Sequence, residues 1–291
     1  MVIIIPSHGR DHVLLDRTLN SIAQCKLPES YRKLVVIENG GTDFGVRDLV
    51  DALPGSLNAQ YMYRERGNKS HALNEALETI SDGLVVFFDD DVIVEQDVLV
   101  KYAEAAREYG EGSFFGGPTR PDYEKEPPDW LRTLMPPSMS GKRLEDWDEN
   151  TRFLGFNWAA FAQDLMEVGG FDPSFGPGSP FDASGQEDDM QARLIRAGKD
   201  GVVVDAMVWH HVPAEKCTLE TVVDRTHSAA ISAGLSTDVW RALLRYPVFL
   251  ASIPLRVGKY VLEGKPYKTR PMWASFAGKV RGLMYRITSS E

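Results

Sequence analysis

Short apolar runs alternate with helix-length segments along the first third of the chain. The segments 14–23, about 43–53 and 69–80 have apolar residues at the three-to-four-residue spacing of a helix. Pro6 is expected to end the first apolar run, which covers residues 2–5. Runs that are apolar at every position are typical of strands buried on both faces, and their alternation with helices predicts a parallel sheet. We therefore expect an α/β fold, with a mostly parallel sheet covered by helices on both faces. The apolar runs are 2–5, 34–37 and 84–88, and a further strand is expected near Ala59 to Tyr63.

The second half of the chain is predicted to complete this sheet and then to become helical. The segment 119–150 is rich in proline and charge, which favours a loop with short helices that could act as a flap over a cleft. A helix is expected over 189–197, and helical segments dominate from Leu219 onward. Strands are expected at 153–161, 202–204 and 207–209. The terminal helices are expected to be interrupted at Pro247, Pro254, Pro266 and Pro271.

Composition and charge narrow the function classes. The 291 residues suffice for one large or two small domains, and 43% hydrophobic with 25% charged residues indicates an ordinary globular protein. The net charge of −10 is unevenly distributed: the segment from Arg241 onward has ten Lys and Arg against two Glu, or +8, which leaves −18 for the rest. An acidic body argues against nucleic acid as a partner, because such binding needs phosphate neutralisation. The basic segment could contact an anionic membrane or be a solvated surface.

Cysteine usage and hydropathy indicate the cellular compartment. Cys25 and Cys217 are the two cysteines of the chain, and they lie far apart in sequence and outside any Cys/His cluster, so neither disulfides nor a zinc site are expected. The run 2–5 is too short for a signal peptide, and no stretch of about 18 uninterrupted apolar residues occurs. We therefore expect a cytoplasmic protein, with peripheral contact to the inner face of the membrane through the basic segment as a further hypothesis.

Three adjacent carboxylates, Asp89, Asp90 and Asp91, directly follow the apolar run 84–88. In parallel α/β sheets the ligand lies at the carboxyl ends of the strands, so this position favours a binding site. Neighbouring carboxylates repel one another, and a cation that prefers hard oxygen ligands, Mg²⁺ or Mn²⁺, would relieve that repulsion. An acidic turn that caps a helix is the alternative interpretation. Glycine motifs of dinucleotide-binding and P-loop enzymes are missing, which argues against both classes.

A second acidic cluster, Glu187, Asp188 and Asp189, follows the Gly/Pro/Ser-rich loop 176–185 and opens a predicted helix. These carboxylates could simply stabilise the N-terminus of that helix, where negative charge is favoured. Alternatively, one of them could act as a general base that removes a proton from a hydroxyl nucleophile.

Other polar and aromatic residues are candidates for ligand contacts. His210 and His211, after the run 207–209, could add an imidazole to a carboxylate-bound metal, although a histidine is more often structural. Lys69 could contact a nucleotide, although an exposed surface lysine is the commoner explanation. Trp158 is interpreted as part of the core or as the wall of a cleft, where an aromatic face can stack on a sugar or a base.

Seven short motifs occur in an order and at a spacing that are specific as a set. They are Ile5-Pro6-Ser7, Ile37 to Asp43, Gly67 to Asn74, Phe88 to Asp91, Gly169 to Pro173, Gly185 to Asp189 and His210 to Pro213. Across about residues 1–215, this set resembles the family 2 glycosyltransferases with the A-type fold. The resemblance implies that the parallel sheet is a nucleotide-diphospho-sugar transferase sheet, followed by a helical C-terminal extension.

The resemblance also implies a reaction. It is the inverting, metal-dependent transfer of a sugar from a nucleotide diphosphate donor, with a UDP-sugar favoured, to a hydroxyl of a saccharide or lipid-linked acceptor, as in polysaccharide biosynthesis. The resemblance implies that Asp91 binds the metal, Mn²⁺ or Mg²⁺, and His211 is favoured over His210 as a second ligand. Asn157 and Trp158 fall on the acceptor side. The nucleotide-sugar positions are Pro6, Ser7, Glu38, Lys69, Asp89 and Asp90.

The catalytic base is the point at which the chain departs from the family pattern. The family usually has Gly-Glu-Asp with an Arg eight residues after the Gly, and the interval from Gly185 to Arg193 preserves this spacing. Without a gap, Gln186 takes the Glu position and Glu187 the base position, whereas a shift by one residue makes Asp188 the base. Glu187 is favoured here, and Asp188 stays open as the alternative.

The resemblance divides the chain into two domains and leaves two other function classes open. A catalytic domain is expected over 1–217, with a donor half at about 1–118 and an acceptor half at about 151–217, and a basic helical extension over 218–291. A sugar nucleotidyltransferase could use a similar cleft, although no Gly-rich loop with Lys or Arg follows the first strand. A non-catalytic nucleotide-sugar or carbohydrate-binding protein would explain the unusual base region.

Overall fold

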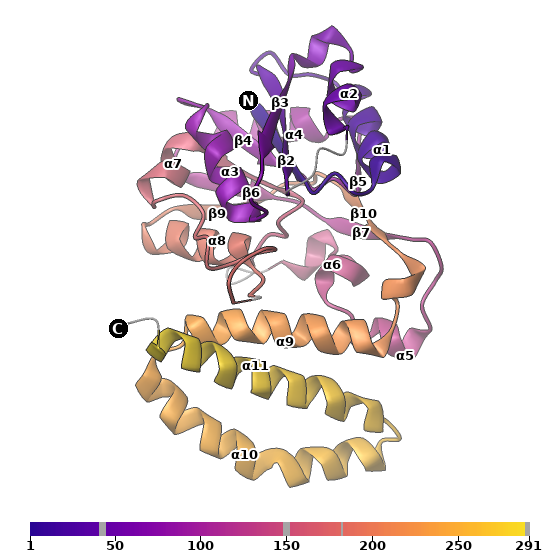
Figure 1. Ribbon diagram of the computed structural model, residues 1–291, viewed down its shortest axis with the longest axis vertical. Helices are drawn as coiled ribbons and strands as arrows, with labels where there is room; N and C mark the ends of the chain where they lie inside the picture. Colours follow the sequence, from indigo (N-terminus) through magenta and orange to yellow (C-terminus); the bar gives the residue numbers. More distant parts are fainter. Residues whose placement is uncertain (41–44, 148–151, 182, 289–291) are drawn as a thin grey trace.

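The structure is a computed structural model that describes residues 1–40, 45–147, 152–181 and 183–288 (Figure 1). The strands are β1 Val2–Ser7, β2 Lys33–Asn39, β3 Ala59–Arg64, β4 Leu84–Phe87, β5 Val92–Val94, β6 Ser113–Gly116, β7 Thr119–Tyr123, β8 Trp158–Phe161, β9 Asp200–Val203 and β10 Val208–Val212. The helices are α1 His12–Ala23, α2 Val46–Asp51, α3 Lys69–Glu78, α4 Val98–Tyr109, α5 Asp129–Arg132, α6 Pro137–Ser140, α7 Ala162–Glu167, α8 Gln186–Arg196, α9 Leu219–Leu235, α10 Val239–Leu262 and α11 Thr269–Thr288. Gly41, Thr42 and Asp43 of the second sequence motif lie outside the described residues.

In the described part of the chain, seven strands form the central sheet, in the order β3-β2-β1-β4-β8-β6-β9. The strands β3, β2, β1 and β4 are parallel, and β8 runs antiparallel to both β4 and β6. Alternate residues of β1 enter two cores: Ile3 and Ile5 pack with α1 and α4, whereas Val2 and Ile4 pack with α3 and α8. The predicted α/β fold, a mostly parallel sheet with helices on both faces, is therefore confirmed.

A smaller sheet, in the order β5-β10-β7, was not predicted. Its middle strand β10 pairs antiparallel with β5 and parallel with β7. Because β7 contains arginine, proline and aspartate and no apolar run, its pairing depends on a partner that is distant in the sequence, and the segment 119–150 was expected to be a loop. His210 and His211 lie inside β10, not after a strand as expected. Since β4 belongs to the central sheet and β5 to the smaller one, the turn between them joins the two sheets.

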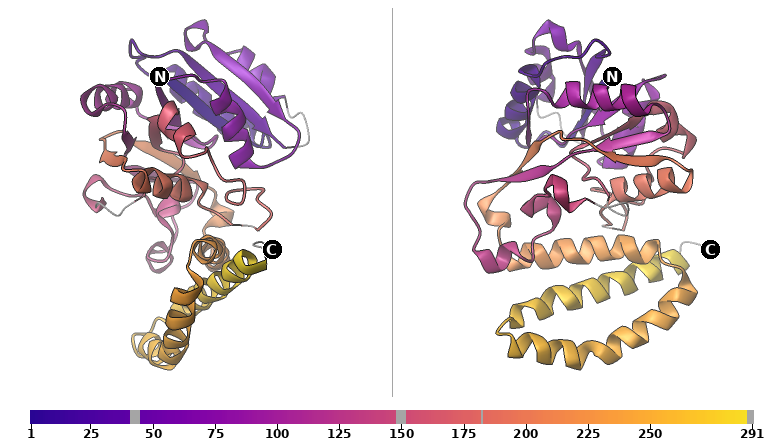
Figure 2. Two further views of the ribbon diagram at one scale, coloured as in Figure 1. Left: turned by 90° about the vertical axis from the view of Figure 1, so that its left-hand side faces the viewer. Right: turned by 180° about the vertical axis from the view of Figure 1, so that it is seen from behind.

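The C-terminal helices form a layer beneath the two sheets, and α9 is the member that contacts them (Figure 1). Val222 of α9 packs with Leu131, and Ile231 of α9 packs with Phe175. The helix α11 lies against α9 so closely that backbone meets backbone, while α10 is the outermost helix (Figure 2). The glycines at the contact between α9 and α11 are Gly234, Gly278 and Gly282.

Several prolines do not interrupt the elements as predicted. Pro247 and Pro254 lie inside α10, and Pro271 lies at the start of α11, so only Pro266 coincides with a break between helices. Pro247 and Pro254 are both exposed, so carbonyl groups that lose an N–H partner can bond to water and the helix bends instead of ending. Pro6 lies within β1, because the pairing of β1 with β4 stops before it.

Three further expectations can be compared with the structure. Cys25 and Cys217 are free thiols, as predicted. The helix expected over 189–197 begins at Gln186, and the strand expected over 153–161 is confined to its last four residues. None of the described helices combines the length and apolar character needed to cross a membrane.

Candidate active site

The acidic triplet lies in the turn between β4 and β5. Asp89 Oδ1 is 2.5 Å from the Nζ of Lys69, which stands at the start of α3. The hydroxyl of Ser7, at the end of β1, donates a hydrogen bond to Asp90 Oδ2 at 2.5 Å. The structure therefore brings four of the predicted nucleotide-sugar positions together at the carboxyl edge of the parallel strands, where α/β sheets bind ligands.

Charge at this turn is only partly balanced. Burial, together with the charges of Asp91 and Asp89, raises the pKa of Asp90 to about 6, against the opposing hydrogen bond from Ser7. Burial would lower the pKa of Lys69, but the charge and hydrogen bond of Asp89 raise it above its ordinary value, so Lys69 is a cation at neutral pH. Lys69 alone does not neutralise three carboxylates, so further positive charge is favoured here, either from other side chains or from a ligand-bound ion.

Asp91 lies against the imidazole of His210. The distance from Asp91 Oδ2 to His210 Nε2 is 3.5 Å, and the backbone N–H of His211 donates to the Asp91 carbonyl oxygen at 2.9 Å. Successive side chains of a strand point to opposite faces, so the ring of His211 lies instead between Asp122 and Glu124, 3.5 Å from a carboxylate oxygen of each. In this structure His210 is the histidine beside Asp91. Within the described ranges, the Nδ1 atoms of both His210 and His211 are buried without a hydrogen-bond partner, so the preference for His211 as the metal ligand stays a prediction.

The groups around Asp91 fit a divalent cation that substrate oxygens would complete. Among the described residues, Asp91 Oδ1 and His210 Nδ1 are buried and have no hydrogen-bond partner. Within the same ranges, no three His, Cys, Asp or Glu side chains converge into a cluster of metal ligands. Mg²⁺ is commonly held by one or two carboxylates together with substrate phosphates, so a site with two protein ligands is compatible with such an ion.

Two cations that the sequence analysis missed act on Asp91. Burial would raise the pKa of Asp91, but the hydrogen bond and charge of His210 and the charges of Lys69 and Lys216 lower it below its ordinary value. The guanidinium of Arg225 in α9 also interacts electrostatically with Asp91, although burial lowers the pKa of Arg225. The approach of Lys216 and Arg225 depends on how α9 packs on the sheets, and no local pattern in the sequence marks these two residues.

A narrow pocket beside the Lys69–Asp89 pair holds the carboxylate of Glu187. Glu187 stands in the first turn of α8 and faces Gly155, where a Cβ atom would lie 2.9 Å from the Glu187 Cδ. Burial, together with the charge of Asp188, raises the pKa of Glu187 to about 7, while the charge of Lys69 opposes this shift. A carboxyl group with a pKa near neutrality is suited to general base catalysis at physiological pH. Other residues that line the pocket are Pro6, Leu73, Trp158 and Phe171.

The other two carboxylates of the second acidic cluster lie outside this pocket. Asp188 does not line the pocket and its side chain is exposed, although burial of the carboxylate raises the pKa of Asp188 as well. Asp189 forms an ion pair with Arg193 at 2.8 Å, one turn further along α8. Glu187 is thus the member of the cluster that lines the pocket. This placement favours Glu187 over Asp188 as the base, and the assignment stays a prediction.

Glu38, predicted on the donor side, and Trp158, predicted on the acceptor side, are both buried. Glu38, near the end of β2, has no exposed surface and accepts a hydrogen bond from the hydroxyl of Tyr61 at 2.7 Å. Trp158 stacks on Phe87 with ring centroids 4.7 Å apart, and it also lines the pocket. Trp158 is therefore part of the core in this structure, and its role as the wall of an acceptor cleft stays a prediction.

Asn157 is part of the interior, not of an open acceptor surface. Its Oδ1 accepts a hydrogen bond from the hydroxyl of Tyr102 at 2.7 Å, and its Nδ2 donates to the carbonyl oxygens of Pro118 and Ala206 at 3.0 and 2.9 Å. The residue has no exposed surface. Because its amide is fully used by these internal contacts, the geometry does not support the predicted acceptor contact of Asn157.

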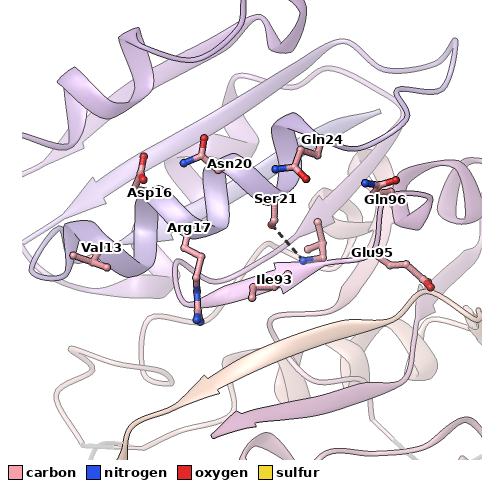
Figure 3. A pocket seen from close by; sticks show the side chains of 10 residues that line it. Val13, Asp16, Arg17, Asn20, Ser21, Gln24, Ile93, Glu95 and Gln96 are labelled. Atoms are coloured by element: carbon pink, nitrogen blue, oxygen red, sulfur yellow. Dashed lines mark hydrogen bonds between the residues drawn. The ribbon is translucent and has the colours of Figure 1, made fainter. Parts of the chain in front are cut away.

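A separate open groove lies between α1 and β5 (Figure 3). Asp16 and Asn20 of α1 and Glu95 beyond β5 lie along its walls, and the hydroxyl of Ser21 accepts a hydrogen bond from the backbone N–H of Val94 at 3.3 Å. None of the predicted site residues lines this groove. The candidate chemistry is therefore located at the acidic turn and the Glu187 pocket.

The sequence matches a known protein family. Residues 2–169, more than half of the sequence, match the family described as Glycosyl transferase family 2. The chain belongs to glycosyl transferase family 2. The resemblance inferred from the seven motifs is therefore confirmed.

Two curated relatives of this family 2 chain are named for sugar chemistry. The succinoglycan biosynthesis protein ExoM of Rhizobium meliloti (strain 1021) is 31% identical over 121 residues, which cover 41% of this chain and 39% of ExoM. The validoxylamine A glucosyltransferase of Streptomyces hygroscopicus subsp. limoneus is 27% identical over an alignment that covers 96% of this chain and 64% of the relative. The chain thus spans less than two thirds of the length of these relatives.

Solved structures of three other glycosyltransferases share the fold of this family 2 chain. The mannosyltransferase PcManGT from Pyrobaculum calidifontis, in complex with GDP-Man and Mn²⁺, has a TM-score of 0.63 at 17% identity and covers 100% of this chain and 87% of its own. GalNAc-T7 with UDP, GalNAc and Mn²⁺ has a TM-score of 0.56 at 13% identity, with 80% and 50% covered. S. aureus TarS 1-349 with UDP has a TM-score of 0.53 at 13% identity, with 99% and 91% covered. These similarities agree with the predicted A-type fold.

Proposed function

We propose that this family 2 glycosyltransferase moves a sugar from a nucleotide diphosphate donor to a hydroxyl group of a saccharide or lipid-linked acceptor. One arrangement carries the proposal: Asp91, which lies 3.5 Å from His210 of β10, stands in the same turn as Asp89, and Asp89 lines the pocket that holds Glu187. Relatives named for succinoglycan biosynthesis and for glucosyl transfer, and neighbours solved with nucleotide sugars and Mn²⁺, support it. Polysaccharide biosynthesis with a UDP-sugar is the version that we favour.

The donor binds at the carboxyl edge of the central sheet. Pro6 and Ser7 contact the nucleotide, because the ends of β1 and β2 lie side by side, with Ser7 paired in register to Glu38. Glu38 has no exposed surface, so the geometry does not support a direct contact of Glu38 with the nucleotide. Lys69 and the neighbouring Asp89 and Asp90 contact the ribose and the diphosphate. The positive charge of Lys69 is already held in place by Asp89, so little reorganisation is needed when the donor binds.

Charge development on the leaving nucleotide is the main barrier that the site must lower. Asp91 and His210 would hold Mn²⁺ or Mg²⁺, which would neutralise negative charge on the diphosphate. Lys216 and Arg225, whose charges already interact with Asp91, add positive charge on the same side. These cations are fixed before reaction, so they stabilise the transition state more than the bound substrate.

Glu187 removes the proton from the acceptor hydroxyl. With a pKa of about 7, Glu187 is ionised in a substantial fraction of molecules at neutral pH and is still basic enough to accept the proton. Attack from the face opposite the leaving nucleotide inverts the anomeric configuration in one displacement. Trp158, which lines the same pocket, provides an apolar wall on the acceptor side. Asp188 is the alternative base.

The proposal includes the division of the chain and its location. Residues 1–217 form the catalytic domain, with the donor half at about 1–118 and the acceptor half at about 151–217, and residues 218–291 form the extension. We place the reaction in the cytoplasm, because the free thiols of Cys25 and Cys217 fit a reducing compartment.

Calorimetric titration of the full chain with UDP, GDP and their sugars, with and without Mn²⁺, tests this function. We expect one nucleotide to bind with an affinity that Mn²⁺ raises, and Asp91→Asn to abolish the Mn²⁺ effect. Asp16→Asn is the matched control, because Asp16 is exposed on α1 and lines the separate groove. The absence of nucleotide binding under all conditions, or an equal loss in both variants, would contradict the proposal. Release of pyrophosphate from a nucleoside triphosphate and a sugar phosphate would instead identify a nucleotidyltransferase.

A further inference from the structure

The helix α10 exposes a line of large apolar side chains. Five residues are 69–90% exposed, and their spacing of four or seven residues places them along one side of the helix. We call them the α10 stripe. They are Trp240, Leu244, Val248, Leu255 and Leu262.

The opposite side of α10 faces the molecule. Ala242 is 1% and Ile253 9% exposed, and Phe249 stacks on Phe276 of α11 with ring centroids 5.2 Å apart. The helix therefore already uses one apolar side for packing, and the α10 stripe is a second apolar side that points away from α11. A soluble helix of this kind normally presents polar residues outward, so the stripe marks a contact surface.

Cations border the α10 stripe along one edge. At 100° per residue, Lys259 falls next to the stripe, whereas Arg245 and Arg256 fall between the stripe and the packed side. There both arginines line a cavity with Phe249 and with Phe276 of α11. All three cations are exposed. The sequence of α10 contains neither Asp nor Glu. An apolar side with tryptophan and leucine, bordered by arginine and lysine, is the pattern of a helix that lies in the interface of an anionic bilayer.

The position of α10 in the molecule suits contact with a charged surface. α10 lies at the end of the molecule opposite the N-terminal sheet (Figure 1). The segment from Arg241 onward carries +8, whereas the rest of the chain carries −18. Electrostatic interactions are screened beyond about 10 Å at 0.1 M salt. An anionic surface beneath α10 would therefore attract the basic segment from Arg241 onward, with little repulsion from the acidic remainder of the chain.

We propose that α10 docks this protein on an anionic lipid bilayer, with the α10 stripe inserted between the headgroups and the three cations among the lipid phosphates. The helix has 24 residues and is about 36 Å long, and it lies parallel to the surface instead of crossing it. This inference does not depend on the chemistry proposed for the active site, because it uses residues of α10 alone.

A second copy of the chain is the other occupant to consider. Two α10 helices packed stripe to stripe would bring the arginine and lysine residues of both copies to the same seam, and α10 supplies no carboxylate to pair with them. Like charges opposed across an interface are unfavourable. An anionic bilayer can bury the apolar stripe among its headgroups and pair the neighbouring cations with lipid phosphates.

Flotation of the full chain with vesicles tests the proposal. We expect binding to vesicles of phosphatidylcholine and phosphatidylglycerol in equal parts, and at least about tenfold weaker binding to phosphatidylcholine alone. Leu255→Glu should weaken binding about tenfold or more, because a leucine that enters the interface is replaced by an anion. Val13→Glu is the matched control, because Val13 and Leu255 are both 79% exposed and Val13 lies on α1, far from the stripe. Replacing Arg245 and Lys259 by Gln should remove the preference for anionic vesicles.

Three results would overturn the proposal. They are the absence of binding to anionic vesicles, equal loss of binding in Leu255→Glu and Val13→Glu, and a dimer in light scattering that Leu255→Glu converts to a monomer without any vesicle binding by the parent chain. Thermal unfolding of each variant checks that it is folded. Since both glutamate substitutions are at exposed positions, their melting temperatures should stay close to that of the parent.

Discussion

The pocket that raises the pKa of Glu187 predicts that removing this carboxylate stabilises the protein while it inactivates the enzyme. Glu187→Gln keeps the shape of the side chain but cannot ionise. The pKa of Glu187 is about 7 in the folded protein, against an ordinary value of 4.5, chiefly because of burial and then because of the charge of Asp188. The folded state therefore binds this proton more tightly than the unfolded state does.

The sign and size of the effect follow from these two values. The stabilising contribution of the protonated Glu187 is fully present below about pH 4.5 and is lost as the pH rises through 7. The full loss corresponds to about 3 kcal/mol, because each pKa unit is worth about 1.4 kcal/mol. Relative to the parent, Glu187→Gln should therefore have a similar free energy of unfolding at pH 4 and a value about 3 kcal/mol higher at pH 8.5.

Urea unfolding, followed by tryptophan fluorescence at several pH values in the presence of EDTA, measures this difference. Glu78→Gln serves as the control, since Glu78 is an exposed residue of α3, and its effect should be small at every pH. The same Glu187→Gln variant should bind the donor but transfer sugar at a rate lowered by about 100-fold or more. In the parent, kcat/KM should rise with pH up to about 7, because the base must be ionised.

A stability difference that does not change with pH would refute the reasoning, because it would show that the ionisation of Glu187 is not suppressed by folding. If Asp188→Asn, and not Glu187→Gln, loses transfer while keeping donor affinity, the base assignment moves to Asp188. Asp188→Asn should also lower the pKa of Glu187, since it removes a neighbouring negative charge. That shift would appear in the pH profile of kcat/KM, whose rise on the acid side would move to lower pH.

Five other substitutions probe the site and the scaffold. His210→Ala should weaken Mn²⁺-dependent nucleotide binding about tenfold or more, whereas His211→Ala should leave it within a few-fold in the same calorimetric titration. Asn157→Ala should lower the free energy of unfolding by about 2–4 kcal/mol in a urea titration, because it leaves buried polar groups unpaired. Gly282→Ala should lower the melting temperature, because a Cβ there would collide with α9, whereas Gly258→Ala in α10 meets no atom within 4 Å and should raise it.

The middle of the central sheet could be predicted because β1, β2 and β4 are buried on both faces, unlike the edge strands β3 and β9. The segments 2–5 and 84–88 are apolar at every position, and this local property is enough to identify buried parallel strands. The acidic turn could be predicted as a candidate site for the same reason, since Asp89 to Asp91 directly follow such a strand. The position of a ligand-binding turn in an α/β sheet is a consequence of strand order, so it needs little knowledge of tertiary contacts.

The smaller sheet and the choice between neighbouring residues could not be predicted from local patterns. The pairing of β7 with β10 joins segments that are distant in the sequence, and Arg120 and Asp122 make β7 resemble a loop. The choice between His210 and His211 depends on which side of β10 faces Asp91, because a shift by one residue exchanges the two faces. Asn157 illustrates a related problem, since the same amide suits a ligand contact and a buried network equally well.

The glycines between α9 and α11 provide a criterion for comparing family members. Gly278 and Gly282 are one turn apart on α11, and a side chain at either would strike the backbone of α9, as would one at Gly234 against α11. A homologue with bulky residues at these three positions could not carry its last helix in this place, so its extension would have to leave the catalytic body at a different angle. The residues at these three positions in an alignment would therefore indicate which homologues place their C-terminal extension as this chain does, before their structures are known.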